Sequence, residues 1–396
     1  MTLSRWLLST RHMLREAALS ALSVRRFHRS IRRLHRQTVL SVLPVLSVFT
    51  TLSAQTSVPV TEAESILRPL VESYGVSGME APVRETVKRL LPVWAKTETD
   101  TAGNLWVRVG KGDPIVVIVA HLDEIGFRVT KIREDGTLEL ERRGGFFPSL
   151  FEGRPALVHT EQGPVPGVFM PRDSVTAGER RTPPPLRADV GVSSAEGVEQ
   201  LGIRVGNTLT MVKQYVRLVG TRATGRSFDD RMGCAALILA LKHLDRARLK
   251  HQVIFVWSVR EEIGLEGATA VANQLGLSTA RVHAVDTFVS ADSPLEVQTF
   301  AVAPVGKGAV ARALDNSAIT PPAQLDSLVA LAKRRGVALQ VGTTNGGNDG
   351  SVFAPYGVPD VPIAWPLRYS HSPAELIDLK DLVSMGELTR AIAEDW

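Results

Sequence analysis

Two adjacent carboxylates, Glu261 and Glu262, come at the end of the apolar run 251–260. A run of this length that is rich in β-branched and aromatic residues is typical of a buried strand, and Gly264 closes it. Neighbouring side chains at the end of a strand point in different directions. One carboxylate can therefore bind a metal ion while the other faces a substrate as a base. Two carboxylates this close also repel each other unless a cation lies nearby.

Other residues of the types that bind metals occupy similar positions. Four further apolar segments begin or end with them: His121 and Asp123 after 114–120, Asp229 and Asp230 before 231–241, Asp286 after 281–285, and His371 shortly after 361–367. In open α/β sheets, ligands bind in the crevice at the carboxyl ends of the strands. The pattern therefore predicts one metal-binding crevice that is built from several strand ends.

The motifs that contain these residues resemble those of a known family. They are His-x-Asp-Glu-x-Gly at His121, Asp-Asp-Arg-x-Gly at Asp229, Glu-Glu-x-Gly at Glu261, the strand-end Asp286, and Arg-Tyr-x-His-Ser at Arg368. The ordered set is similar to that of the co-catalytic metallo-aminopeptidases of family M42, which include the tetrahedral and deblocking aminopeptidases. The resemblance extends from about Thr61 to the C-terminus. One position departs from the family pattern, since Asn348 stands where the family usually has Thr.

The resemblance implies a two-metal active site. Its ligands would be His121 and Asp286 for one cation, Glu262 and His371 for the other, and Asp229 for both. Glu261 would act as general base and then as general acid, and Asp123 would orient the ring of His121. Nitrogen and oxygen ligands without thiolate suit two divalent ions per subunit, Zn²⁺ first and also Co²⁺ or Mn²⁺. Members of the family assemble as dimers or as dodecamers, so a homo-oligomer is expected.

The hydrophobic pattern predicts an α/β fold with an insertion. Helix and strand patterns alternate before His121 and again from Asp229, whereas 125–218 holds short β-like runs separated by Gly, Pro and Asp, the last of which is a strand predicted over 208–218. We therefore expect a mixed-sheet α/β/α di-metal peptidase domain, residues 56–124 plus 219–396, with an inserted small β-barrel for oligomerisation, residues 125–218. A capping-box pattern, 61–64, predicts the start of the first helix, and Pro69 should kink this helix or shift its start.

The first 55 residues differ from the rest of the chain. The 396 residues carry a formal net charge of +5, but residues 1–55 hold nine Arg and one acid, which leaves −3 for residues 56–396. This mildly acidic body argues against a nucleic-acid partner. A basic stretch before the apolar run 38–54 is typical of a targeting segment, so we expect export to the periplasm or the cell exterior. The alternatives are a membrane anchor if the segment is not cleaved, an organellar transit peptide, and a cytoplasmic protein whose start is wrongly assigned.

Metallo-aminopeptidase activity on peptide substrates is the function that the resemblance implies. From the residues alone, two alternatives stay open. A related di-metal amide hydrolase, such as an amino-acyl deacylase or a carboxypeptidase, would use the same Glu-Glu pair. A non-catalytic binding protein should have lost Glu261 or a ligand, and none is lost. The single cysteine, Cys234, excludes an intramolecular disulfide and is expected in the core of its helix.

Overall fold

The computed structural model describes residues 58–172, 184–290, 292 and 302–396. The targeting segment predicted for residues 1–55 lies outside the described residues and stays a prediction. Among the helices that are described, none has the length and apolar character that a membrane crossing requires.

An eight-stranded mixed sheet forms the core of the α/β part of the chain. Its strands, in spatial order, are β1 (Thr97–Thr99), β2 (Leu105–Val109), β12 (Val253–Ser258), β3 (Ile115–His121), β13 (Thr279–Val289), β16 (Ile363–Leu367), β14 (Ala309–Leu314) and β15 (Leu339–Thr343). The four central strands, β12, β3, β13 and β16, are parallel. Their carboxyl ends therefore meet at one edge of the sheet, where the predicted metal ligands fall.

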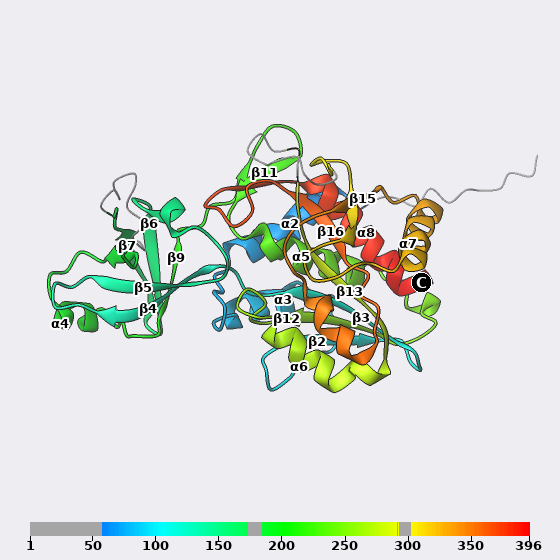
Figure 1. Ribbon diagram of the computed structural model, residues 1–396, viewed down its shortest axis with the longest axis horizontal. Coiled ribbons are helices and arrows are strands. Elements are labelled where there is room, and N and C mark those ends of the chain that lie inside the picture. The colour runs from blue at the N-terminus through cyan, green and yellow to red at the C-terminus, as the bar shows by residue number, and fades with distance from the viewer. Residues whose placement is uncertain (1–57, 173–183, 291, 293–301) are drawn as a thin grey trace, which may run out of the picture. The chain divides into compact units, whose positions relative to one another are not determined.

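Helices cover both faces of this sheet (Figure 1). On one face, alternate residues of β3 such as Ile118 share a core with α2 (Val60–Glu72), α3 (Ala81–Leu90), α5 (Phe228–Lys242), α7 (Pro322–Arg335) and α8 (Leu379–Asp395). On the other face, the intervening residues, such as Val117, pack with α6 (Glu266–Leu275). The two sets alternate because successive side chains of a strand point to opposite faces. The predicted α/β/α architecture is confirmed.

A closed six-stranded barrel lies between β3 and α5 in the chain. Its strands, in spatial order, are β4 (Gly126–Ile132), β5 (Leu138–Arg143), β8 (Arg187–Asp189), β7 (Gly163–Phe169), β6 (Pro155–Thr160) and β9 (Thr208–Met211), and α4 (Ala195–Gln200) precedes β9. Its core contains a cluster of phenylalanines among aliphatic side chains: the ring of Phe127 contacts those of Phe146, Phe151 and Phe169 at centroid distances of 5.1, 5.4 and 5.0 Å. The predicted β-barrel is confirmed.

The prediction of one continuous strand over 208–218 is wrong, because this stretch forms two separate strands. After β9, the chain buries Lys213, whose Nζ lies 2.8 Å from Glu124 Oε1. The next strand, β10 (Val216–Arg217), pairs with β11 (Arg222–Gly225) in a separate three-stranded sheet with β17 (Glu375–Asp378). The buried ion pair thus takes the chain out of the barrel, and the alternating pattern did not reveal it.

The first described helix also differs from its prediction at its start. α2 begins at Val60 with Pro59 as its N-cap, and no side chain caps it, so the predicted capping box is wrong. The helix continues through Pro69 to Glu72. Burial of apolar side chains such as Leu67 and Leu70 offsets the backbone hydrogen bond that Pro69 cannot donate.

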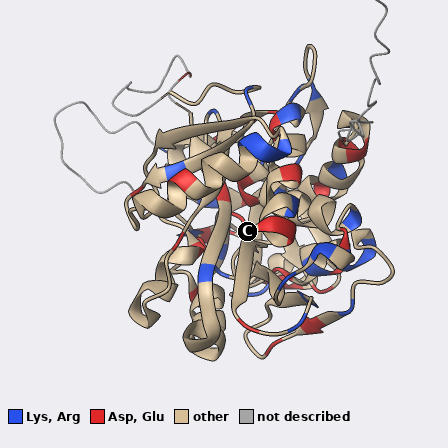
Figure 2. Ribbon diagram, turned by 90° about the vertical axis from the view of Figure 1, so that its right-hand side faces the viewer, with Lys and Arg blue, Asp and Glu red and all other residues tan. Residues whose placement is uncertain are grey.

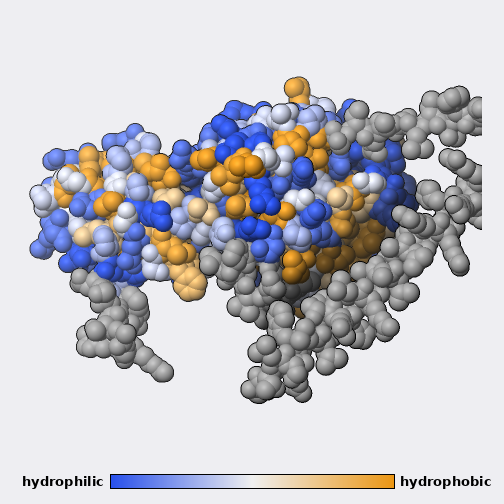
Figure 3. Space-filling model, turned by 90° about the horizontal axis from the view of Figure 1, so that it is seen from above, coloured by the Kyte–Doolittle hydropathy of each residue, from blue (hydrophilic) through white to orange (hydrophobic). Residues whose placement is uncertain are grey.

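Charged and apolar residues are interspersed on the surface. Around the C-terminus, acidic and basic residues adjoin one another (Figure 2), and Arg335 of α7 forms ion pairs of 2.5 Å with Glu394 and Asp395 at the end of α8. On the face seen in Figure 3, apolar residues occur in separate patches. Cys234 is buried in α5, as predicted.

Candidate active site

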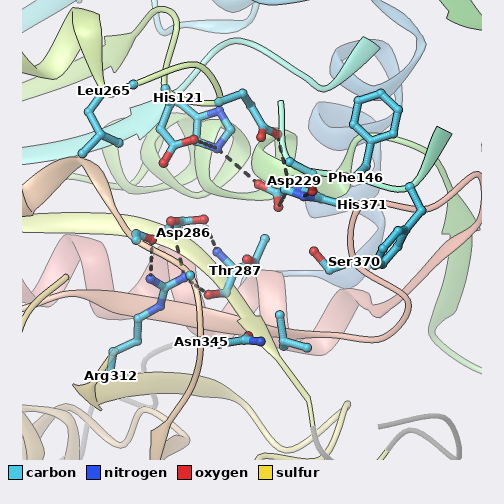
Figure 4. Close-up of a pocket in the computed structure, with 18 of the residues that line it drawn as sticks. His121, Phe146, Asp229, Leu265, Asp286, Thr287, Arg312, Asn345, Ser370 and His371 are labelled. Carbon is cyan, nitrogen blue, oxygen red and sulfur yellow. Dashed lines mark hydrogen bonds and ion pairs between the residues drawn. The ribbon is translucent and has the colours of Figure 1, made fainter. Parts of the chain in front are cut away.

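Strand ends, one helix start and a position inside β13 bring the predicted site residues together, since the strand expected to end before Asp286 continues to Val289. Val119 of β3 pairs with Ala284 of β13, so His121 and Asp286, each two residues further on, lie level on the same face of the sheet. The Glu261–Glu262 pair follows β12, whose last residue pairs with His121. Asp229 comes from the start of α5, and His371 follows β16 (Figure 4).

The first group of metal-ligand atoms comes from His121, Asp229 and Asp286. One ligand atom of each residue lies within 4.8 Å of the others, and all three residues are buried. His121 Nε2 is 3.2 Å from Asp229 Oδ1. Asp229 therefore presents one carboxylate oxygen to this group.

The second group comes from Asp229, Glu262 and His371, again with one atom of each within 4.8 Å of the others. His371 Nε2 is 3.2 Å from Asp229 Oδ2 and 3.3 Å from Glu262 Oε1. The two carboxylate oxygens of Asp229 thus face two different imidazoles. All five residues predicted as ligands meet in two groups that share Asp229.

Neighbouring positive charge does not fully offset the burial of two carboxylates in these groups, those of Glu262 and Asp286. Burial raises the pKa of Glu262 and of Asp286, although His371 acts against the first shift and Arg312 against the second. Glu262 Oε1 is buried, and although His371 Nε2 lies 3.3 Å away, the contact lacks hydrogen-bond geometry. A buried oxygen without a hydrogen bond is costly, and a cation at this group would remove that cost. The residues present therefore fit a metal site.

The two imidazoles supply positive charge in the same place. Burial alone would lower the pKa of His121 and of His371. The charge of Glu261 raises the pKa of His121, the charge of Glu262 raises that of His371, and hydrogen bonds to Asp229 raise both. Both pKa values are therefore well above the ordinary value. Burial raises the pKa of Asp229, yet its bonds to both imidazoles bring its pKa below the ordinary value. The site therefore attracts cations electrostatically, whether protons or metal ions.

Glu261 belongs to neither group of ligand atoms. Its Oε2 lies 3.9 Å from His121 Nε2, and it lines a pocket of about 650 Å³ together with all five predicted ligands. Figure 4 shows this pocket open between Asp286 and Thr287 on one side and Ser370 and His371 on the other. A carboxylate in this position can exchange a proton with a molecule in the pocket without leaving a metal.

Comparison with known proteins identifies the family. The model for the family described as M42 glutamyl aminopeptidase matches residues 103–388. The chain belongs to the M42 family. Two relatives of this M42 peptidase are named for different N-terminal residues. The lysyl aminopeptidase of Pyrococcus furiosus is 29% identical over 348 residues, 83% of this chain and 96% of that protein. The glutamyl aminopeptidase of Lactococcus lactis is 27% identical over 344 residues, 82% of this chain and 94% of that protein.

A solved structure agrees with this assignment. The TET1 peptidase of Pyrococcus horikoshii, which can assemble into a tetrahedron or a large octahedral shell, is 32% identical with a TM-score of 0.76, covering 84% of this chain and 100% of that one. M42 is a metallopeptidase family, and the M42 peptidase described here is a peptide hydrolase.

Asp123 holds the Glu-Glu segment of the M42 peptidase by its main chain. Its carboxylate accepts hydrogen bonds from the backbone N–H of Glu261 at 2.9 Å and of Glu262 at 3.1 Å, and from the Ser77 hydroxyl at 2.6 Å. The ring of His121 lies further away: Nδ1 is 3.2 Å from the Asp123 carbonyl oxygen and 3.5 Å from the carboxylate. Asp123 therefore contacts both the predicted base segment and the predicted ligand.

Two other buried carboxylates hold ligand-bearing main chain in the same way. Asp230 accepts the N–H of His121 at 3.1 Å. Glu375 accepts the N–H of His371 at 3.1 Å and that of Phe228, next to Asp229, at 2.8 Å. Glu375 thus links the two segments that form the second group. It was not predicted as a site residue, although its position four residues after His371 is a signal that could have drawn attention to it.

The segments that carry the site are also unusual in their backbone. In the described part of the chain, the non-glycine residues with positive φ are Ser227, Arg260, Leu265, Tyr369 and His371, at 68°, 54°, 57°, 62° and 57°. Such conformations cost of order 1–3 kcal/mol each and persist only where surrounding contacts hold them. Here they lie within four residues of Asp229, Glu261 or His371, and the hydrogen bonds that Asp123 and Glu375 accept from these segments are such contacts.

Arg312 is a buried cation at the edge of the first group. Its Nη2 lies 3.3 Å from Asp286 Oδ2 and donates to the carbonyl oxygen of Thr287, and its Nη1 lies 3.1 Å from Asp315 Oδ2. Asn348, the departure from the family pattern, donates to the same Asp315 oxygen at 2.8 Å, so it supports this network. A lone arginine within strand β14 carries no sequence signal that points to the site.

Proposed function

We propose that this M42 peptidase removes N-terminal residues from peptides with the help of two divalent cations bound at the two groups. The observation that carries the proposal is the position of Asp229, whose two oxygens face His121 and His371 separately. A carboxylate between two ligand sets is what a pair of neighbouring cations requires.

The donor atoms suggest which cations these are. His121, Asp229 and Asp286 would hold one ion, and Asp229, Glu262 and His371 the other. Imidazole and carboxylate without thiolate suit Zn²⁺, Co²⁺ or Mn²⁺. When bound, such ions polarise a carbonyl group and make water a nucleophile at neutral pH.

Proton transfer falls to Glu261 in this proposal. Its carboxylate lines the pocket beside the ligand groups and is free of a ligand role. It accepts a proton from the attacking water and then donates it to the amine nitrogen of the leaving peptide. The carboxylate of Asp123 keeps Glu261 in position through the backbone N–H.

Metal removal and a choice of substrate termini test the proposal. Protein treated with a chelator should lose hydrolysis of leucyl-p-nitroanilide and regain it with Zn²⁺, Co²⁺ or Mn²⁺. Peptides with a free N-terminus should be cut, whereas the same peptides with an acetylated N-terminus should not. Activity that survives full metal removal would contradict the metal dependence. Release of the acetyl group or of C-terminal residues would instead indicate an amino-acyl deacylase or a carboxypeptidase.

We also propose that the protein is a homo-oligomer. The related TET1 peptidase assembles into large shells, and residues 56–396 carry a net charge of only −3, which opposes self-association weakly. Light scattering on residues 56–396 should therefore give a mass of a dimer or more, and a monomer at micromolar concentration would refute this. Loss of the oligomer on deleting residues 125–218 would support an interface in the inserted barrel.

A further inference from the structure

The pocket in front of the ligand groups has few charges left for a substrate side chain. Apart from the ligand groups and Glu261, the described residues that line it include one ionic side chain, Arg312. The others include five apolar side chains: Phe146, Phe147, Leu150, Leu265 and Val289. The relatives named for lysyl and glutamyl substrates differ in specificity, so the preference of this chain must be read from its own pocket.

The charge of Arg312 is already neutralised. Its guanidinium is 2% exposed and forms ion pairs with Asp286 and Asp315. An acidic substrate side chain would have to compete with two resident carboxylates for it. A basic side chain would meet a like charge there. Within the described lining, neither kind of side chain finds an unengaged partner outside the proposed catalytic groups.

The segment from the end of β5 through η2 (Pro148–Phe151) presents apolar side chains to the pocket. Phe146 is buried against Phe151 at a ring-centroid distance of 5.1 Å and anchors the segment in the barrel core. Phe147 and Leu150 remain 76% and 43% exposed. Exposed large apolar side chains that gather at a pocket mark a surface that an apolar ligand would cover favourably.

A hydrogen bond ties this segment to the second ligand group. The Gly145 carbonyl oxygen lies 2.7 Å from His371 Nδ1. Figure 4 accordingly shows Phe146 on the His371 side of the pocket, whereas Leu265 lies on the His121 side. Leu265 and Val289 are already half-buried. A ligand would therefore bury more apolar surface, and gain more binding free energy, by covering Phe147 and Leu150.

We propose that Phe147 and Leu150 form the wall that contacts the side chain of the N-terminal residue, and that the enzyme prefers neutral apolar N-terminal residues to acidic or basic ones. This inference rests on the proposed aminopeptidase function. Each methylene that a hydrophobic pocket buries changes kcat/KM by about tenfold or more. Partial covering of a leucine side chain should therefore favour leucine over alanine by about 10- to 100-fold.

A panel of p-nitroanilides of Leu, Phe, Ala, Glu and Lys tests the preference with the metal-reconstituted full chain. Leu and Phe should have the highest kcat/KM, and Glu and Lys should fall below Ala. If Glu or Lys is the best substrate, the proposed preference is wrong while the aminopeptidase function stands. If none of the five is hydrolysed, the aminopeptidase function itself fails.

Variants test the wall. Phe147→Ser and Leu150→Ser should each lower the ratio of kcat/KM for Leu to that for Ala, measured within the same variant, by about fivefold or more. Val205→Ser is the matched control, since Val205 is also an apolar residue of the insertion, 61% exposed, but does not line the pocket. Its ratio should equal that of the wild type. A wild-type ratio in both wall variants would show that another surface selects the side chain.

Discussion

The substitution Glu261→Gln separates proton transfer from metal binding. Glutamine keeps the size of the side chain but cannot accept and return a proton. The backbone of residue 261 should stay in place, because the Asp123 carboxylate binds its N–H at 2.9 Å independently of the side chain. The ligand Glu262 should also keep its position, because the same carboxylate binds its N–H at 3.1 Å. We therefore expect kcat to fall about 10²- to 10⁴-fold, a rise of about 3–5 kcal/mol in the activation barrier, with both metal sites intact.

The assay needs two readouts on the same preparation. Turnover of leucyl-p-nitroanilide gives kcat, and plasma mass spectrometry gives metal ions per chain. Glu266→Gln is the matched control, because Glu266 follows closely in the chain but is 52% exposed and pairs with Arg260. It should behave like the wild type. A Glu261→Gln variant with kcat within tenfold of the wild type, or one that no longer binds metal, would refute the assigned role.

Three further substitutions probe the frame of the site, and a fourth, at Asp360, probes a buried carboxyl group outside it. Asp229→Asn should lower occupancy of both metals, whereas Asp286→Asn should mainly empty one, and equal single-site losses would show that Asp229 is not shared. Glu375→Gln should weaken metal binding about 10- to 100-fold at the His371 group, as measured by competition with a chromogenic chelator, and unchanged affinity would remove its positioning role. Burial, assisted by the charge of Asp315, raises the pKa of Asp360 from 3.8 to about 8. The unfolded state therefore loses this proton first, and stability falls as pH rises between these values. Asp360→Asn should gain about 1–4 kcal/mol relative to the wild type between pH 5 and pH 9 in urea unfolding, whereas a constant difference would contradict the shifted pKa.

The sequence reveals much of this site because strand ends are simple to locate. Apolar runs that end in His121 or lead to Glu261 have the length and the β-branched content that indicate buried strands, and parallel strands bring their ends to one edge. The same reasoning predicts the α/β/α layers and the inserted barrel. Residue type then marks the candidate ligands at those positions, and the resemblance to the M42 motifs implies which of them bind which metal ion.

The residues that hold the ligands are harder to predict. Glu375 and Arg312 act through contacts between segments that are distant in the sequence. Nothing in the local pattern distinguishes Arg312 from a surface charge, and the one local signal for Glu375 is its position four residues after His371. The positive φ of Ser227 is likewise imposed by tertiary contacts rather than by residue type. The prediction of one strand through Lys213 was wrong because periodicity does not register a buried ion pair.

The most direct test of the shared carboxylate is a crystal structure of the zinc-reconstituted protein with data collected on both sides of the zinc absorption edge. We predict two anomalous peaks per chain, one beside His121 and Asp286 and the other beside Glu262 and His371, with Asp229 between them. A single peak, or peaks away from Asp229, would contradict the two-metal account.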